Sequence, residues 1–280
     1  LPLSTAMTDH QHLPSPVPNR PLNALDIADG AFAILRGRPR TVAAIAAAFV
    51  LPVQLITAWA DRNVFSTFSL DNFDTETGQF EGQNDFTSFG AFGGSTIGTV
   101  LEFLILPFLG VAFTHLVLGW RQGVDRGALE CLTFTMRKTH IILAVFVLSK
   151  VIQVVTLLLT TPMLMLLAPI IAVEGLGPLA TIKRAFQLGR RRYGHLLGLL
   201  LLIVLINFLL TYALLGIPVL GAFLLGDWGW IAFFALGSIG TTVLTILGTG
   251  AAVLAYFETR DRVEGDDILR RVQLARGIRA

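Results

Sequence analysis

The sequence predicts an all-α integral membrane protein, and three observations lead to this prediction. Charged residues make up only 14% of the 280 residues, whereas 54% are hydrophobic. A soluble domain typically carries about 25% charged residues. The apolar runs are far longer than the 4–8 residues of a buried β-strand. The basic residues also gather between alternate apolar runs, as expected for a chain that crosses a bilayer repeatedly.

Six apolar stretches are candidate membrane spans: residues 41–59, 97–120, 140–159, 162–173, 195–215 and 228–257. A helix that rises 1.5 Å per residue needs about 20 residues to cross the hydrocarbon core. Five stretches meet this length. The stretch 162–173 is too short, which predicts a short, tilted or partly re-entrant crossing.

The distribution of charge predicts the topology. With six spans and both termini in the cytoplasm, nineteen of the 21 lysines and arginines lie on the cytoplasmic side. Only Arg62 then lies outside, and only Lys150 lies within a span. This is the arrangement that the positive-inside rule favours. We therefore expect a multi-pass protein of the cell membrane.

The segments outside the spans differ in character. Residues 1–20 are polar and rich in proline, which predicts a disordered cytoplasmic tail. The membrane domain covers residues 21–257, and residues 258–280 form a basic cytoplasmic tail. The outer loop at 61–96 is acidic and rich in glycine, with a possible short hairpin that turns near residues 77–78. We expect this loop to be solvated, and the alternative is a docking surface for a protein partner.

A repeated pattern precedes the first, third and fifth spans. In each case an amphipathic segment is followed by a basic cluster and then by a span; these copies begin at Ala31, Leu129 and Ala185. Residues 179–190 place Leu179, Ile182 and Phe186 on one face, the pattern of a helix lying in the membrane interface. The six-span bundle is therefore expected to contain three approximate repeats of an interfacial helix followed by a transmembrane hairpin.

Glu102 and Lys150 are the formally charged residues predicted deep within spans. A charge at the bilayer centre costs roughly 2.5–3.5 kcal/mol on insertion scales, which makes such a residue a functional hypothesis. Their estimated depths allow them to meet, because a lysine side chain can extend along an apolar surface. We expect an ion pair that locks packing, and the alternatives are a gating or proton-coupled site, or no contact.

A basic cluster precedes the fifth span and has two interpretations; it contains Lys183, Arg184, Arg190, Arg191 and Arg192. It can serve topology alone, or it can also bind anionic lipid head groups. Nucleic-acid binding is not expected, because no recognition fold accompanies the cluster. The sequence has no nucleophile elbow, P-loop or metal-ligand spacing, so no catalytic, cofactor or metal site is expected.

Three stretches resemble a family of bacterial membrane proteins: PLNALDIADGAFAILRGRPRTV, APIIAVEGLGPLATIKRAFQLGRRRYGHLLG and LAYFETRDRVEGDDI. The chain resembles the glycerophosphoryl diester phosphodiesterase membrane domain family, which is common in actinobacteria. In some members this membrane region is joined to a catalytic barrel. This sequence has no histidine-arginine-glycine start and no room for a barrel, so the resemblance does not carry the phosphodiesterase activity over.

These features together predict a non-enzymatic multi-span protein of the bacterial cytoplasmic membrane. Its expected role is a scaffold or accessory module in envelope or lipid processes, with membrane lipids, including anionic ones, as partners. The alternative is a transporter or lipid-handling protein with a polar site around Lys150 and Glu102.

Overall fold

The computed structural model describes residues 23–66, 73–74, 79–80, 89–156, 158–224 and 229–265. The predicted tail at 1–20, the end of the predicted tail after residue 265 and most of the outer loop lie outside these residues. The described elements are α1 (Ala24–Gly37), α2 (Pro39–Ser66), β1 (Phe73–Asp74), β2 (Gln79–Phe80), α3 (Phe89–Arg121), α4 (Ala128–Arg137), α5 (Thr139–Val155), α6 (Thr161–Leu164), α7 (Leu167–Glu174), α8 (Pro178–Arg191), α9 (Tyr193–Leu224) and α10 (Gly229–Glu264). The predicted all-α class is confirmed.

Four helices of the described chain are long and apolar enough to cross a membrane on their own: α2, α3, α9 and α10. The predicted spans at 140–159 and 162–173 fall on shorter helices, because α5 has 17 residues, α6 has 4 and α7 has 8. The count rises to six only if two bent helix pairs, α4 with α5 and α6–α7 with α8, are each taken as one span. Four crossings and six crossings both leave the two termini on the same side of the membrane.

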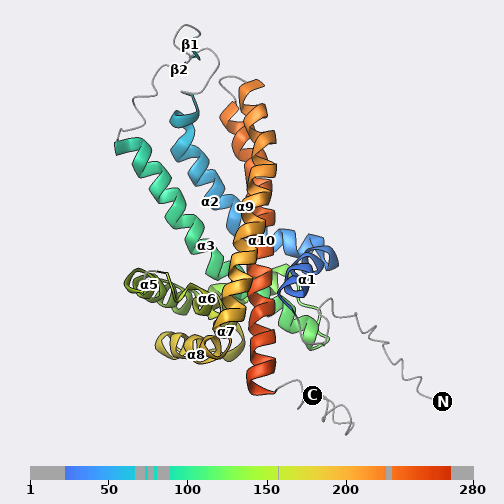
Figure 1. Cartoon of the computed structure of the whole chain (residues 1–280). Helices are drawn as coiled ribbons and strands as arrows, with labels where there is room; N and C mark the ends of the chain where they lie inside the picture. The colour runs from blue at the N-terminus through green and yellow to red at the C-terminus, as the bar shows by residue number, and fades with distance from the viewer. Residues whose placement is uncertain are drawn as a thin grey trace, which may run out of the picture.

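The order of the elements follows the predicted repeat. Each of the short helices α1, α4 and α8 leads through a sharp bend into a hairpin, formed by α2–α3, α5–α7 and α9–α10 respectively. The middle hairpin is much shorter than the other two. In Figure 1, α5 and α8 lie to one side of α9 and α10, across the direction of the long helices.

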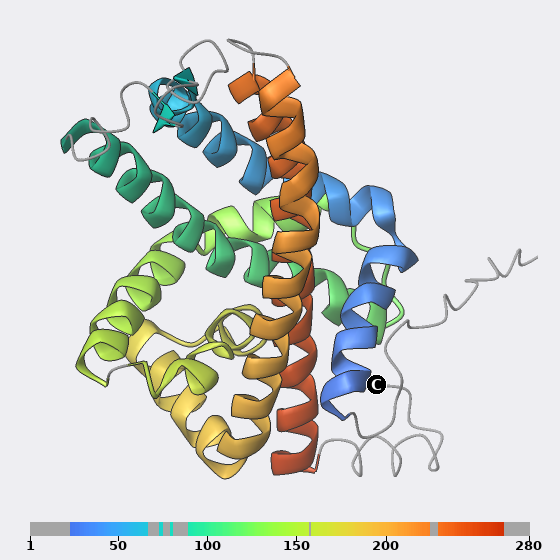
Figure 2. The same ribbon diagram turned by 45° about the horizontal axis from the view of Figure 1, so that its top comes forward.

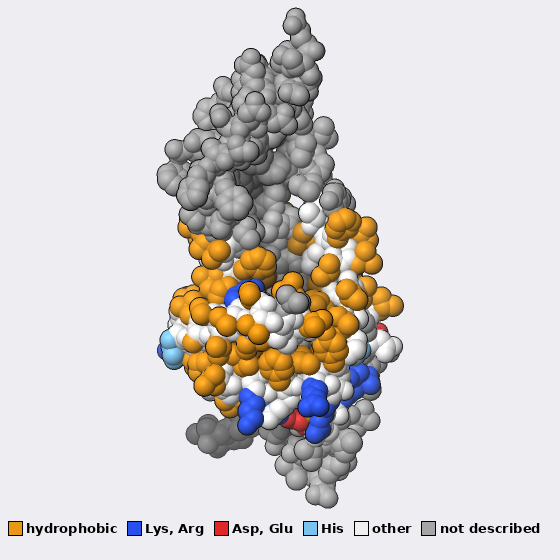
Figure 3. All heavy atoms as spheres, turned by 60° about the vertical axis from the view of Figure 1, so that its left-hand side comes forward, with side chains coloured by type: hydrophobic (Ala, Val, Ile, Leu, Met, Phe, Trp, Pro, Cys, Tyr) orange, Lys and Arg blue, Asp and Glu red, His pale blue; other side chains and the backbone are white. Residues whose placement is uncertain are grey.

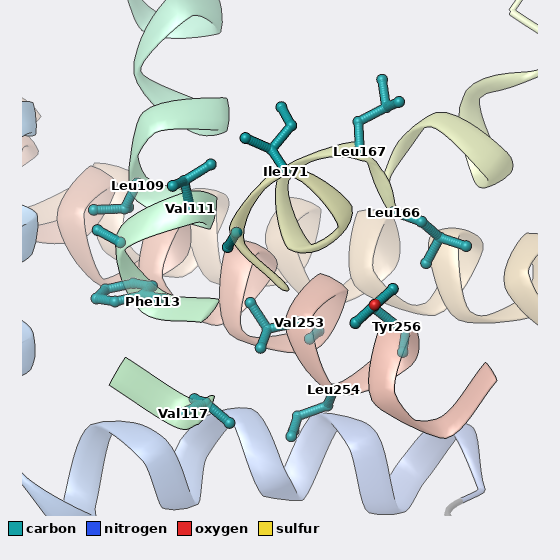
Figure 4. Close-up of a cluster of buried hydrophobic side chains, with 14 of the residues drawn as sticks. Leu109, Val111, Phe113, Val117, Leu166, Leu167, Ile171, Val253, Leu254 and Tyr256 are labelled. Atoms are coloured by element: carbon teal, nitrogen blue, oxygen red, sulfur yellow. The ribbon is translucent and has the colours of Figure 1, made fainter. Parts of the chain in front are cut away.

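Helix α10 is the central element of the bundle, since it packs against α1, α2, α3, α7, α8 and α9. Figures 1 and 2 show α9 beside α10, and Figure 2 shows α1 against the other side of α10. The core of the bundle around α10 is apolar. Figure 4 shows Leu109 and Phe113 of α3 near Ile171 of α7 and Val253 of α10, and all four are buried. Gly110 allows α3 to approach α7, because a Cβ atom there would lie 2.7 Å from the Cβ of Ala168.

The surface of the molecule matches a bilayer. Figure 3 shows hydrophobic side chains as a broad band on the face that carries α5, with lysines and arginines gathered below the band. Helix α9 exposes Leu205, Phe208 and Leu209, each by more than half of its surface. Such a continuous apolar band is typical of a protein whose solvent is lipid.

A short β-hairpin lies in the outer loop. Strand β1 pairs with β2 in antiparallel orientation, with Phe73 opposite Phe80 and Asp74 opposite Gln79. The predicted hairpin is therefore confirmed, although the residues of its turn are outside the described ones.

Candidate functional site at the basic end of the bundle

Helix α8 begins after a break that its own sequence explains. Gly175 ends α7 in the left-handed conformation (φ 62°), and Pro178 occupies the first position of α8. The buried face of α8 consists of Thr181, Ile182, Ala185, Leu188 and Gly189. The helix is amphipathic, as predicted. Leu179 nevertheless lies on the opposite face with 74% of its surface exposed, because the covered side of α8 faces α5, α6 and α7.

The five predicted basic residues of this region divide into two groups. Lys183, Arg190 and Arg191 are exposed and form no ion pair with any residue that the structure describes. Arg184 binds Glu174 of α7, with its Nε atom 2.9 Å from Oε2, and also binds Glu264 of α10. The Nη1 atom of Arg192 lies 3.3 Å from Oε1 of Glu258 in α10. Two of the five basic residues are therefore held within the protein, and three are available to lipid or water.

The last turns of α10 bind residues of three neighbouring helices. The Tyr256 hydroxyl donates to Glu174 of α7 over 3.0 Å. Asp261 accepts a hydrogen bond from Arg121, the last residue of α3, over 2.8 Å. Glu264 binds Arg184 of α8 and, over 3.0 Å, Arg260 of its own helix. The end of α10 thus binds the ends of α3 and α7 and the middle of α8.

Glu258 is the most deeply buried carboxylate of this network. Its side chain is only 4% exposed, and it binds both Arg192 and Arg262. A carboxylate in this position requires such partners, because burial of an isolated charge is very unfavourable. Sequence reasoning did not identify it. The four-residue spacing of Glu258 with Arg262 and of Arg260 with Glu264 is visible in the sequence, but the partners from other helices are not.

Arg184 stays charged in this environment. Burial disfavours its charged form, but hydrogen bonds to Glu264 and Glu174 outweigh this effect and raise the pKa of its guanidinium further. Arg184 therefore acts as a permanent cation that joins α7, α8 and α10.

Each bend between one of the short helices α1, α4 and α8 and the helix that follows it carries a basic residue. Arg38 lies between α1 and α2, Lys138 between α4 and α5, and Arg192 between α8 and α9. We call these three residues the elbow cations. Each binds an acceptor on another helix or loop: Asp125 for Arg38, the carbonyl oxygen of Ile171 for Lys138 (2.9 Å), and Glu258 for Arg192. The basic clusters of the repeats therefore have a common structural role at the bend.

Lys150 lies in an aromatic environment. Its Nζ atom is 3.1 Å from Oε1 of Gln153, 4.5 Å from the ring centre of Phe103 and 5.5 Å from that of Phe146. These contacts place α5 against α3 beside residue 102. The side chain of Glu102 lies outside the described residues, so its ion pair with Lys150 stays a prediction.

Models of protein families gave no match to the chain. Curated proteins and solved structures gave no match either. The resemblance to the glycerophosphoryl diester phosphodiesterase membrane domain family therefore remains a prediction. Its three stretches contain the elbow cations Arg38 and Arg192 and the carboxylates Glu174 and Glu258, of which Arg192 and Glu258 form an ion pair.

Proposed function

We propose that this protein is a non-enzymatic membrane protein that binds anionic lipid head groups through α8. In this role it is a scaffold or accessory module for envelope or lipid processes in a bacterial cytoplasmic membrane. The observation that supports this proposal most is the division of the basic residues of α8. Arg184 and Arg192 are held by carboxylates, whereas Lys183, Arg190 and Arg191 are exposed, as is Leu179 at the start of the same helix.

An exposed leucine and three exposed cations on one short helix suit the boundary between acyl chains and head groups. The leucine enters the acyl region, and the cations meet phosphate groups at the surface. Each basic residue near an anionic leaflet contributes about 1 kcal/mol, so three contribute about 3 kcal/mol, which is roughly a hundredfold in affinity. A non-catalytic role is supported by the carboxylates Glu174, Glu258 and Glu264, because each is engaged by arginine.

The test is lipid binding by the triple variant Lys183→Gln, Arg190→Gln, Arg191→Gln. Purified protein in neutral detergent is titrated with phosphatidylglycerol or phosphatidylcholine, and bound lipid is counted by native mass spectrometry. We expect the triple variant to lose most of the preference for phosphatidylglycerol. Its thermal stability without lipid should stay close to that of the wild type, because these side chains have no described ion pair.

The matched control replaces three exposed basic residues of the other two repeats, Arg36, Arg40 and Arg137, by glutamine. This variant loses the same formal charge from exposed positions outside α8. We expect it to keep most of the preference for phosphatidylglycerol. Equal losses in both triple variants would mean that the charge serves topology and general attraction rather than a site on α8.

A second candidate function is a transporter or lipid-handling protein with its polar site around Lys150 and Glu102. It is favoured by Lys150 itself, a cation on α5 whose described neighbours are Gln153 and two phenylalanine rings. Cation–π contacts stabilise such a charge but do not replace an ionic partner. A carboxylate at residue 102 would supply that partner.

A double-mutant cycle with Glu102→Gln and Lys150→Met tests this pair, with thermal stability in detergent as the measurement. The two effects should be non-additive, since removal of one partner leaves a lone charge behind. Additive effects would show that the residues do not interact. A double variant that is stable but inactive in cells would favour the transporter over the scaffold.

A further inference from the structure

The turn between α5 and α6 lies beside the start of α9. The hydroxyl group of Tyr193, the first residue of α9, donates to the carbonyl oxygen of Leu159 in this turn over 2.9 Å. Tyr193 directly follows the basic residues Arg190–Arg192. A hairpin that crossed the hydrocarbon core would carry its turn about 30 Å away from that end. The turn instead lies at the level of the basic bend that joins α8 to α9.

A second contact agrees with this position. Met163 of α6, four residues after Leu159, packs against Gly189 of α8 so closely that a Cβ atom on Gly189 would lie 2.8 Å from the Met163 side chain. At the other end of the hairpin, Glu174 binds Arg184 of α8. Both the turn and the end of the hairpin therefore contact the same interfacial helix and its bend.

Several polar groups of the described turn have partners within it, although the Thr161 hydroxyl has none among the described residues. The backbone N–H groups of Thr156, Leu158, Leu159 and Thr161 donate to the carbonyl oxygens of Ile152, Gln153, Thr156 and Leu158 over 2.9–3.0 Å. The Thr156 hydroxyl bonds the Ile152 carbonyl and the Thr160 hydroxyl, each over 2.8 Å. A backbone group left without a partner in hydrocarbon costs several kcal/mol, and these bonds remove that cost for the groups they join.

The surface of the turn is apolar. Val154, Val155, Leu158 and Leu159 are between 65% and 77% exposed. The chain has no charged residue between Lys150 and Glu174. Leu158 has a positive φ of 66°, a conformation for which glycine or asparagine would be preferred in a water-facing turn. A leucine there keeps an apolar side chain on the surface despite the backbone strain.

We propose that α5, α6 and α7 form a re-entrant hairpin. Its turn enters the acyl region of the leaflet on which α8 lies, and the hairpin returns to the same side without crossing the bilayer. The partner of this surface is the acyl chains of that leaflet. The chain then crosses the membrane four times, through α2, α3, α9 and α10. This proposal uses the basic bend after α8 to locate the membrane surface, but it does not require α8 to prefer anionic lipid.

Single-cysteine variants in a Cys131→Ser background test the hairpin. Leu159→Cys and Val155→Cys probe the turn, Gln79→Cys probes the outer loop, and Arg191→Cys probes the basic end. A membrane-impermeant maleimide is applied to intact cells and to inverted vesicles. The two turn variants should react at least tenfold more slowly than Gln79→Cys in cells and at least tenfold more slowly than Arg191→Cys in vesicles.

Spin labels on the same cysteines in liposomes then measure depth. Labels at 155 and 159 should collide more often with oxygen, which dissolves in the acyl region, than with a water-soluble nickel complex. The label at 191 should show the reverse. Reaction of the turn from outside at the rate of Gln79→Cys would mean a full crossing and would overturn the proposal. Reaction from the basic side at the rate of Arg191→Cys, or a water-exposed spin label, would overturn it equally.

Discussion

Helices α1 and α8 have the same construction but carry different charges. Both contain 14 residues, and both end at an elbow cation, Arg38 for α1 and Arg192 for α8. Their second residues, Leu25 and Leu179, are 69% and 74% exposed. In the same register, Ala31 and Ala185 are both buried, as are Ile34 and Leu188. The two helices therefore share a buried face, an exposed leucine and a basic bend.

The exposed faces differ. Four residues after the exposed leucine, α1 has Asp29 and α8 has Lys183, and both side chains are exposed. Near the end, α1 exposes Arg36 alone, whereas α8 exposes Arg190 and Arg191. Because α1 forms the shared structure without this positive charge, folding of such a helix does not require it. The extra charge of α8 is therefore not required for the shared fold, which leaves lipid binding and topology as its two candidate roles.

The first prediction compares the two bends and has the largest expected effect. Glu258→Gln removes the carboxylate that binds Arg192. The Glu258 side chain is only 4% exposed. Loss of one partner of a buried pair costs about 3 kcal/mol or more. The corresponding change at the bend of α1, Asp125→Asn, removes a carboxylate that is 53% exposed and should cost less than about 1 kcal/mol. The measurement is the free energy of unfolding in mixed micelles, and equal costs would refute the distinction between the two bends.

The second prediction concerns how tightly each helix packs. A Cβ atom at Gly189 would meet the Cγ, Cβ and backbone Cα of Met163 at 2.8, 2.9 and 3.2 Å. Gly189→Ala should therefore destabilise the protein by about 2 kcal/mol, because α6 or α8 must move. At Gly30 of α1 a Cβ atom would lie 2.6 Å from a terminal methyl group of Leu254, which can rotate away. Gly30→Ala should be close to neutral, since alanine also favours the helix by about 1 kcal/mol.

The features that α1 and α8 share are the kind that the sequence could predict. The amphipathic segments, the basic clusters at the bends and the long spans are local patterns of charge and hydropathy. They therefore predicted the order of helices and the repeat. The middle hairpin was harder, because residues 140–159 have the length and hydropathy of a span. The distribution of basic residues could not determine the path of this hairpin either. The segments before and after a hairpin lie on the same side of the membrane whether or not the hairpin crosses it.

The candidate site was predictable only in part. The five basic residues of the α8 region stand together in the sequence and were identified from it. Their division into bound and free cations depends on Glu174, Glu258 and Glu264, which come from α7 and α10. No local pattern contains the distance between a carboxylate on one helix and an arginine on another. The ion pair of Lys150 with Glu102, also predicted from sequence, still awaits its test.

The third prediction addresses the residue that follows each elbow cation. This residue is Tyr193 after α8 and Pro39 after α1. The Tyr193 hydroxyl is a described partner of the Leu159 carbonyl. Tyr193→Phe keeps the ring but leaves that carbonyl without this donor, so it should reduce the free energy of unfolding by about 1 kcal/mol. A change below about 0.3 kcal/mol would indicate that water or lipid replaces the hydroxyl group, as a hydrated turn would allow.

The last prediction exchanges the charge that distinguishes the two helices. Asp29→Lys gives α1 the cation that α8 has at Lys183, and Lys183→Asp gives α8 the anion of α1. Both side chains are exposed, so each change should alter the free energy of unfolding by less than about 0.5 kcal/mol. Binding of phosphatidylglycerol should respond in opposite directions. One basic residue near an anionic surface contributes about 1 kcal/mol, so Asp29→Lys should strengthen binding roughly fivefold and Lys183→Asp should weaken it at least as much. The neutral variants Asp29→Asn and Lys183→Gln should fall between these limits if charge is the cause. If the Lys183 variants bind phosphatidylglycerol like the wild type while Asp29→Lys binds more tightly, the surface near α1 is the stronger lipid site, and the assignment of that role to α8 is wrong.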